Sequence, residues 1–123
     1  LLEEIDFSFN FFSLTQIFMR RSRNLRVILI ENCNISSIDK ESFDFEIFKN
    51  LFYINLSFNK IQIIKESYFR NNLNLNYLNL SNNMIYSIET NALRQYKSLD
   101  LSFNQLSRKL RISLNEELLI NNN

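Results

Sequence analysis

The sequence predicts an α/β-type solenoid, a single domain of stacked coils that covers residues 1–123. The first observation is a repeated pattern, because the spacing of Leu51, Ile54 and Leu56 recurs from Leu75 onward. The second is that this spacing extends along the chain, so that coils start near residues 2, 25, 51, 75, 96 and 115. The third is size, since 123 residues, of which 46% are apolar, allow one continuous core but not two independent ones.

Each coil is predicted to begin with a short strand. In the coil that starts at Leu51, the two-residue alternation of extended chain turns Ile54 and Leu56 inward and the residues between them outward. One such strand cannot bury its apolar side alone, whereas stacked coils cover one another. We therefore expect neighbouring strands to pair in parallel about 4.8 Å apart and to form one long sheet on a concave face.

A column of polar side chains follows the predicted strands. An Asn amide at this place can donate to and accept from backbone groups of its own coil and of the adjacent one. The second coil has Cys33 instead, and a structural role is favoured over a reactive thiol or metal ligand because this Cys is alone and the chain has no His. The predicted ladder consists of Asn10, Cys33, Asn59, Asn83, Asn104 and Asn123.

The segments that return from each strand to the next are predicted to close the far side of the core with Phe43, Phe69 and Leu93. Gly and Pro are both absent, so the turns must be made by Asn, Asp and Ser. Asn can replace Gly in tight turns because it tolerates the left-handed backbone region well.

The repeated segments "LFYINLSFNKI", "LNYLNLSNNMI" and "YKSLDLSFNQL" match the pattern L-x-x-L-x-L-x-x-N-x-L, and over nearly its whole length the chain resembles the leucine-rich repeat family. Phe43 and Phe69 resemble the variant found in extracellular proteins such as Toll-like receptors and Slit-type proteins. The resemblance implies a right-handed superhelix with a concave parallel sheet and an irregular or short-helical convex side. It also implies a non-catalytic receptor module that binds a protein ligand or co-receptor without a cofactor.

The residue content argues against catalysis, nucleic-acid binding and membrane insertion. Without His the chain lacks the usual base at neutral pH, and no Ser has a plausible activating partner. Asp6 and Asp100 share a sheet column, but four coils separate them by about 19 Å, too far for paired carboxylate chemistry. The net charge of +1 gives no field that would recruit nucleic acid, and no apolar run approaches the roughly 20 residues of a membrane helix.

The concave sheet is the predicted partner-binding surface, because exposed Tyr and Phe on a rigid sheet are favoured at protein interfaces. Cross-strand pairing of aromatic side chains is the alternative explanation of the same residues. The basic run Arg20, Arg21, Arg23 and Arg26 could bind a phosphate or a heparin-like polyanion, but a solvated return loop is the favoured interpretation. The candidate partner-binding residues are Phe52, Tyr53, Asn55, Tyr77, Asn79, Lys97 and Asp100.

Asn34, Asn55 and Asn79 begin Asn-x-Ser sequons, which would carry glycans in a secreted protein. Chance alone accounts for about 2.6 sequons in a chain with 20 Asn and 16 Ser and Thr, so three are no enrichment. We expect an extracellular or cell-surface ectodomain, with a cytoplasmic scaffold or adaptor and a structural spacer as alternatives. The chain begins on a consensus Leu and ends on a consensus Asn, which predicts a fragment without either cap.

Overall fold

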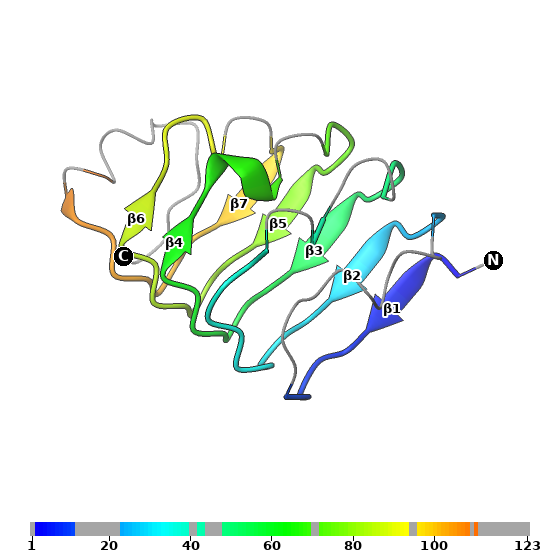
Figure 1. Cartoon of the computed structure of the whole chain (residues 1–123), viewed down its shortest axis with the longest axis horizontal. Coiled ribbons are helices and arrows are strands. Elements are labelled where there is room, and N and C mark those ends of the chain that lie inside the picture. Colours follow the sequence, from blue (N-terminus) through cyan, green and yellow to red (C-terminus); the bar gives the residue numbers. More distant parts are fainter. Residues whose placement is uncertain are drawn as a thin grey trace.

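The computed structural model describes residues 2–11, 23–39, 42–43, 48–69, 72–93, 96–108 and 110. Within this part of the chain, five short strands form one sheet in which every neighbouring pair is parallel (Figure 1). The predicted sixth coil near residue 115, together with Asn123, lies outside the described residues. In sheet order, the strands are β1 (Glu4–Asp6), β2 (Val27–Leu29), β3 (Tyr53–Asn55), β5 (Tyr77–Asn79) and β7 (Ser98–Asp100).

The register of the sheet follows the sequence repeat. Tyr53 pairs with Tyr77, and Ile54 pairs with Leu78. Each strand therefore presents its middle residue to the core and its two outer residues to the opposite side. The predicted solenoid with a parallel sheet is confirmed.

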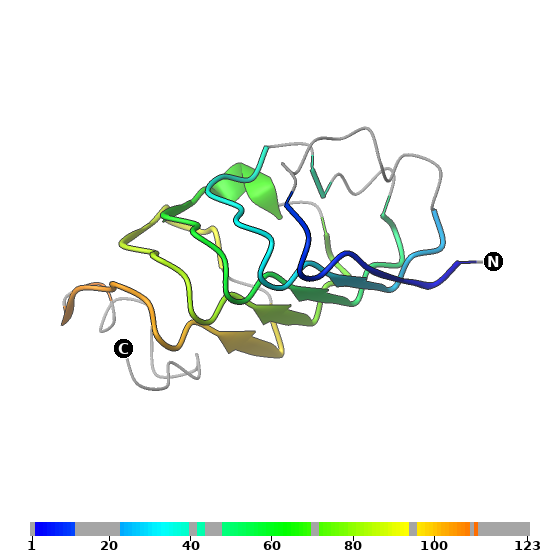
Figure 2. The same ribbon diagram turned by 90° about the horizontal axis from the view of Figure 1, so that it is seen from below.

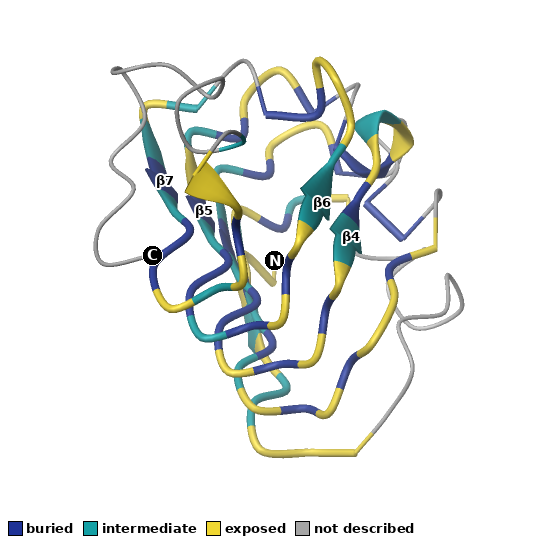
Figure 3. Cartoon of the chain, turned by 90° about the vertical axis from the view of Figure 1, so that its left-hand side faces the viewer, coloured by how far each residue is buried: buried dark blue, intermediate teal, exposed yellow. Residues whose placement is uncertain are grey.

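The core lies on the inner side of this sheet and runs from the second coil to the fifth (Figure 3). Leu51, Ile54 and Leu56 of the third coil are completely buried, as are Leu25, Ile28 and Ile30 of the second. Each such side chain contributes roughly 1.5 to 3 kcal/mol when it is removed from water. Because the second, third and fourth coils bury side chains at the same three positions, the stacking of coils stabilises the sheet.

The far side of the core is more regular than the sequence predicts. Two-residue strands β4 (Ile63–Ile64) and β6 (Ser87–Ile88) pair in parallel and form a second small sheet across the core from the first (Figures 2 and 3). A single turn of 3₁₀ helix, η1 (Glu66–Tyr68), follows β4. Phe69 is the residue directly after η1, and its ring stacks on that of Phe43 with the centroids 5.4 Å apart.

The turn after each sheet strand contains a residue with positive φ at the same repeat position. This residue is Asn32 or Asn82 in the second and fourth coils, as expected for a left-handed turn without Gly. The other three coils have Phe9, Phe58 and Phe103 there, with φ between 55° and 62° and more than half of each side chain exposed. The backbone is held in place because the Phe58 N–H donates to the Ser81 carbonyl of the next coil at 3.1 Å.

Candidate functional site

The Asn ladder lies just after the strands of the sheet and holds the backbone there in place. The Asn59 amide nitrogen donates to the Ile30 carbonyl of the preceding coil at 2.8 Å and to the Leu56 carbonyl of its own coil at 3.0 Å. Its amide oxygen accepts from the N–H groups of Cys33 and Ile35 at 3.0 Å each. A single buried side chain therefore joins two coils and satisfies backbone groups that no strand pairs.

The other described members of the ladder repeat this arrangement where a preceding coil exists. Asn83 donates to the Leu56 carbonyl and accepts from Ile61 N–H, and Asn104 donates to the Leu80 carbonyl. Asn10 lies in the first coil and donates only within it, to the carbonyls of Phe7 and Ser8.

Cys33 takes over one part of the amide's role. Its thiol donates to the Phe7 carbonyl of the preceding coil at 3.2 Å, the same bond that the amides make elsewhere in the column. The side chain is completely buried, and burial raises the pKa of the thiol. A buried neutral thiol is a poor nucleophile and a poor metal ligand.

The outward side of the five-stranded sheet, hereafter the sheet face, presents two columns of side chains. One column runs through Val27, Tyr53, Tyr77 and Ser98. The other runs through Leu29, Asn55, Asn79 and Asp100. Asp6 and Asp100 fall in the same second column, with three strands between them.

Turns hold the second column in place. The side-chain oxygens of Asn55, Asn79 and Asp100 each accept from the N–H of the Ser two residues later, at 2.9 to 3.0 Å. Asp6 makes the same turn with Ser8, whose hydrogen bonds lower the pKa of the Asp6 carboxyl. These side chains are therefore oriented before any partner arrives.

An aromatic cluster covers the middle of the sheet face. The Phe52 and Tyr77 rings meet edge to face with their centroids 5.0 Å apart. The Arg26 guanidinium lies over the other side of this cluster, 6.0 Å from the Phe52 centroid. Burial raises the pKa of the Tyr53 hydroxyl, and a hydrogen bond with the Asn79 side chain offsets part of that rise. The hydroxyl is thus neutral at physiological pH and available as a donor or acceptor.

These side chains surround an open hollow of about 460 Å³ that crosses four strands. This volume is within the range of small-molecule pockets. Five of the seven predicted partner-binding residues line the hollow, namely Phe52, Tyr53, Tyr77, Asn79 and Asp100. Val27, Leu78 and Ser98 complete its wall.

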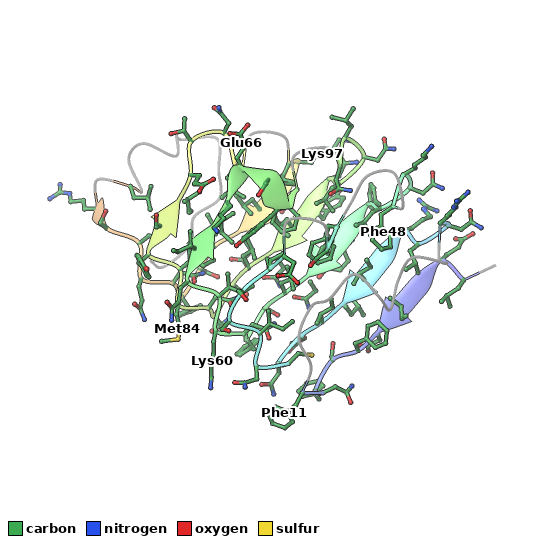
Figure 4. The ribbon with its side chains drawn as sticks, viewed as in Figure 1. Phe11, Phe48, Lys60, Glu66, Met84 and Lys97 are labelled. Carbon is green, nitrogen blue, oxygen red and sulfur yellow. The ribbon has the colours of Figure 1, made fainter. Side chains whose placement is uncertain are left out.

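The remaining two predicted residues lie beside the hollow. Asn55 donates to the Glu31 carboxylate at 3.3 Å, which places a further acidic group at the ends of the strands. Lys97 is exposed just before β7, near the edge where the strands begin, whereas Lys60 and Met84 project from the opposite edge (Figure 4). Of these charged groups, Lys97 lies beside the strand starts and Glu31 beside the strand ends, where Lys60 also projects.

Comparisons with known proteins agree with this geometry. The family model described as leucine rich repeat matches residues 49–106. The chain is a leucine-rich repeat protein. It resembles the ectodomains of Toll-like receptors, since a crystal structure of a TLR13–ssRNA13 complex superimposes with a TM-score of 0.65 and 33% sequence identity. The match covers 78% of this chain but only 14% of the TLR13 chain. None of the curated proteins compared with the chain matches it.

The three sequons lie in two different environments. Asn34 is exposed in the loop after β2, where its φ is 60°. Asn55 and Asn79 are half-buried on the sheet face, and their side-chain oxygens are bound in turns. Asn79 lines the hollow, the Asn55 amide nitrogen donates to Glu31, and Asn34 lies away from both.

Sequence reasoning missed one contact beside the site. Arg26 is exposed just before β2, as expected for a solvated loop, but its N–H also donates to the Glu3 carbonyl at 2.7 Å and its guanidinium lies 6.0 Å from the Phe52 ring centroid. The signal was available in the repeat, because Arg26 and Phe52 occupy the same position of their coils. Arg23 is described and exposed, whereas Arg20 and Arg21 lie outside the described residues.

Within the described ranges, no group of three or more His, Cys, Asp or Glu residues is placed to hold a metal ion. The same part of the chain includes no helix with the length and apolar character needed to span a membrane.

Proposed function

We propose that this chain is a protein-recognition module, part of a Toll-like or other extracellular leucine-rich repeat receptor, that binds a protein ligand or co-receptor through its sheet face. The observation that carries the proposal is the hollow of about 460 Å³, which aromatic side chains line on a rigid sheet. Tyr and Phe are enriched where proteins bind one another because they supply contact area with little loss of conformational entropy.

Recognition by contact is favoured over chemistry. Leucine-rich repeat proteins and Toll-like families are typically non-catalytic. The ladder and the turns hold the sheet-face side chains in one arrangement, so a partner does not have to order them on binding. The module is thus proposed to act through shape and charge, with no cofactor.

A nucleic-acid partner is the second candidate, because the similar TLR13 structure is a complex with ssRNA13. The charges of the sheet face favour a protein. RNA binding depends on rows of basic side chains that neutralise phosphates. Here Asp6, Glu31 and Asp100 lie at the strand ends, and Glu4 lies among the basic groups at the strand starts, so the described sheet face has no continuous basic row.

The experiment is a selection of random twelve-residue peptides displayed on phage against the immobilised 123-residue chain. Selected peptides should lose binding to the Tyr53→Ala, Tyr77→Ala double variant and keep binding to Tyr86→Ala. Tyr86 is the matched control because it is an exposed Tyr away from the hollow. Circular dichroism would confirm that all variants fold.

Selected peptides that bind the double variant with full affinity would overturn the proposal. Preferential binding of a single-stranded oligouridylate that competes with the peptides would replace it with the nucleic-acid candidate. The extracellular setting is tested separately: a signal peptide and Cys-rich caps in the parent sequence would support a receptor ectodomain. A free N-terminus without them would support a cytoplasmic scaffold, and a sheet face that binds nothing would support a structural spacer.

A further inference from the structure

The hollow on the sheet face is asymmetric in its chemistry. Its wall at β2 and β3 is apolar, formed by Val27, Phe52 and Tyr53, and Tyr77 continues this surface into β5. Its wall at β7 is polar, formed by Ser98 and Asp100. A ligand that fills the hollow must therefore be apolar at one end and able to interact with a carboxylate at the other.

Asp100 is positioned to bind such a ligand. Both hydrogen bonds that it accepts come from Ser102, through N–H at 2.9 Å and Oγ at 2.5 Å, and both go to Oδ1. Oδ2 has no hydrogen-bond partner among the described residues. Within the described ranges Asp100 forms no ion pair, and its carboxylate is the charged group among the residues that line the hollow.

From these observations we propose that the hollow takes an extended peptide segment with an aromatic side chain and, two residues later, a basic side chain. This assignment rests on the proposed function and names the chemistry of its partner. The aromatic side chain packs on Phe52 and Tyr77, and the basic side chain pairs with Oδ2 of Asp100.

The spacing follows from sheet geometry. Tyr77 and Asp100 lie on adjacent strands and two residues apart in register, so they are separated by about 8 Å from the strand spacing and the rise per residue. In an extended peptide, side chains two residues apart point to the same face at about 6.7 Å, and a long Arg side chain covers the difference. Side chains on consecutive residues point to opposite faces and cannot both enter the hollow.

The probe is the blocked tripeptide acetyl-Phe-Ser-Arg-amide, titrated into the ¹⁵N-labelled 123-residue chain and followed by the backbone amide signals of Tyr77, Ser98 and Asp100. Three further probes test each part of the proposal: Ala in place of Phe, Glu in place of Arg, and the order Phe-Arg-Ser. The expected result is that Phe-Ser-Arg binds about fivefold more tightly than Phe-Ser-Glu, as for a half-exposed ion pair. This preference should weaken as salt is added.

Asp100→Asn is the decisive variant, because Asn55 and Asn79 already make the same turn with an amide and the substitution preserves the fold. It should reduce the preference for Arg over Glu to less than twofold. Asp6→Asn is the matched control, since it removes the same charge from the same column and the same kind of turn outside the hollow. It should leave the preference unchanged.

Four results would overturn the assignment: equal affinity for the Arg and Glu probes, equal affinity for the Phe and Ala probes, equal effects of the two Asp variants, or displacement of every peptide by a single-stranded oligouridylate. Peptides from the phage selection that need Tyr53 and Tyr77 but contain no basic residue would overturn only this assignment and leave the recognition module standing. A selection in which no peptide needs these two Tyr would instead remove the proposed function itself.

Discussion

Substitution of Asn59 by Leu tests whether the ladder holds the coils together. Leu has the same number of side-chain heavy atoms and the same branching as Asn but is larger, so the change removes hydrogen bonds without opening a cavity. It leaves the N–H groups of Cys33 and Ile35 without their acceptor in the buried turn. An unsatisfied buried donor costs about 1 to 3 kcal/mol, so two of them should lower the free energy of unfolding by at least about 2 kcal/mol. This is a large fraction of the roughly 5 to 15 kcal/mol that stabilises a typical domain.

The matched control is Asn10→Leu, at the same repeat position in the first coil. Asn10 is exposed, and its amide donates only to carbonyls of its own coil, which water can reach after the substitution. Its effect should stay within about 0.5 kcal/mol. Urea unfolding followed by circular dichroism measures both free energies, with the m-value showing whether compactness has changed. Equal stabilities of the two variants would refute the reasoning that the ladder acts between coils.

Three further substitutions follow from the same structure and are checked by thermal unfolding. Phe69→Ala removes a buried ring stacked on Phe43 and should destabilise the chain by about 3 to 5 kcal/mol, so a melting temperature within a degree or two of the parent would contradict it. Asn72→Leu should raise stability by about 1 kcal/mol, because this buried amide has no hydrogen-bond partner among the described residues and Phe48 occupies the equivalent place in the preceding coil; a loss of stability would disprove this. Phe58→Asn should raise stability by about 0.5 to 1 kcal/mol, since Asn tolerates the left-handed backbone and the Phe ring is mostly exposed, and a decrease would mean that the ring packs.

The sequence repeat was sufficient to predict the strands and their register. Tyr53 lies beside Tyr77 because the spacing between one coil and the next sets which residues pair, and the buried middle residue of each strand prevents a slip by one position. The two sheet columns could be written down for the same reason. Repetition fixes what is common to all coils.

What the repeat could not predict depends on how individual side chains and turns pack. The small sheet of β4 and β6 has two residues per strand, too few to show a pattern of alternation. The shape of the hollow depends on how the Phe52 and Tyr77 rings meet edge to face in its wall, and rotamers are not encoded by spacing. The positive φ of Phe58 was also unexpected, because propensity alone assigns that conformation to Asn.

The structure explains how the sheet face can change its charge without changing the fold. At four of the five strands, the last residue must supply an oxygen that accepts from the N–H two residues later, and either Asn or Asp meets that need; Leu29 is the exception. The turn therefore fixes where this side chain lies but leaves its charge free. The neighbouring ladder is more restricted, because Asn59 must donate and accept at once and a carboxylate cannot do both. Specificity for a partner is thus expected to lie in the column of Asn55, Asn79 and Asp100, and stability in the ladder beside it.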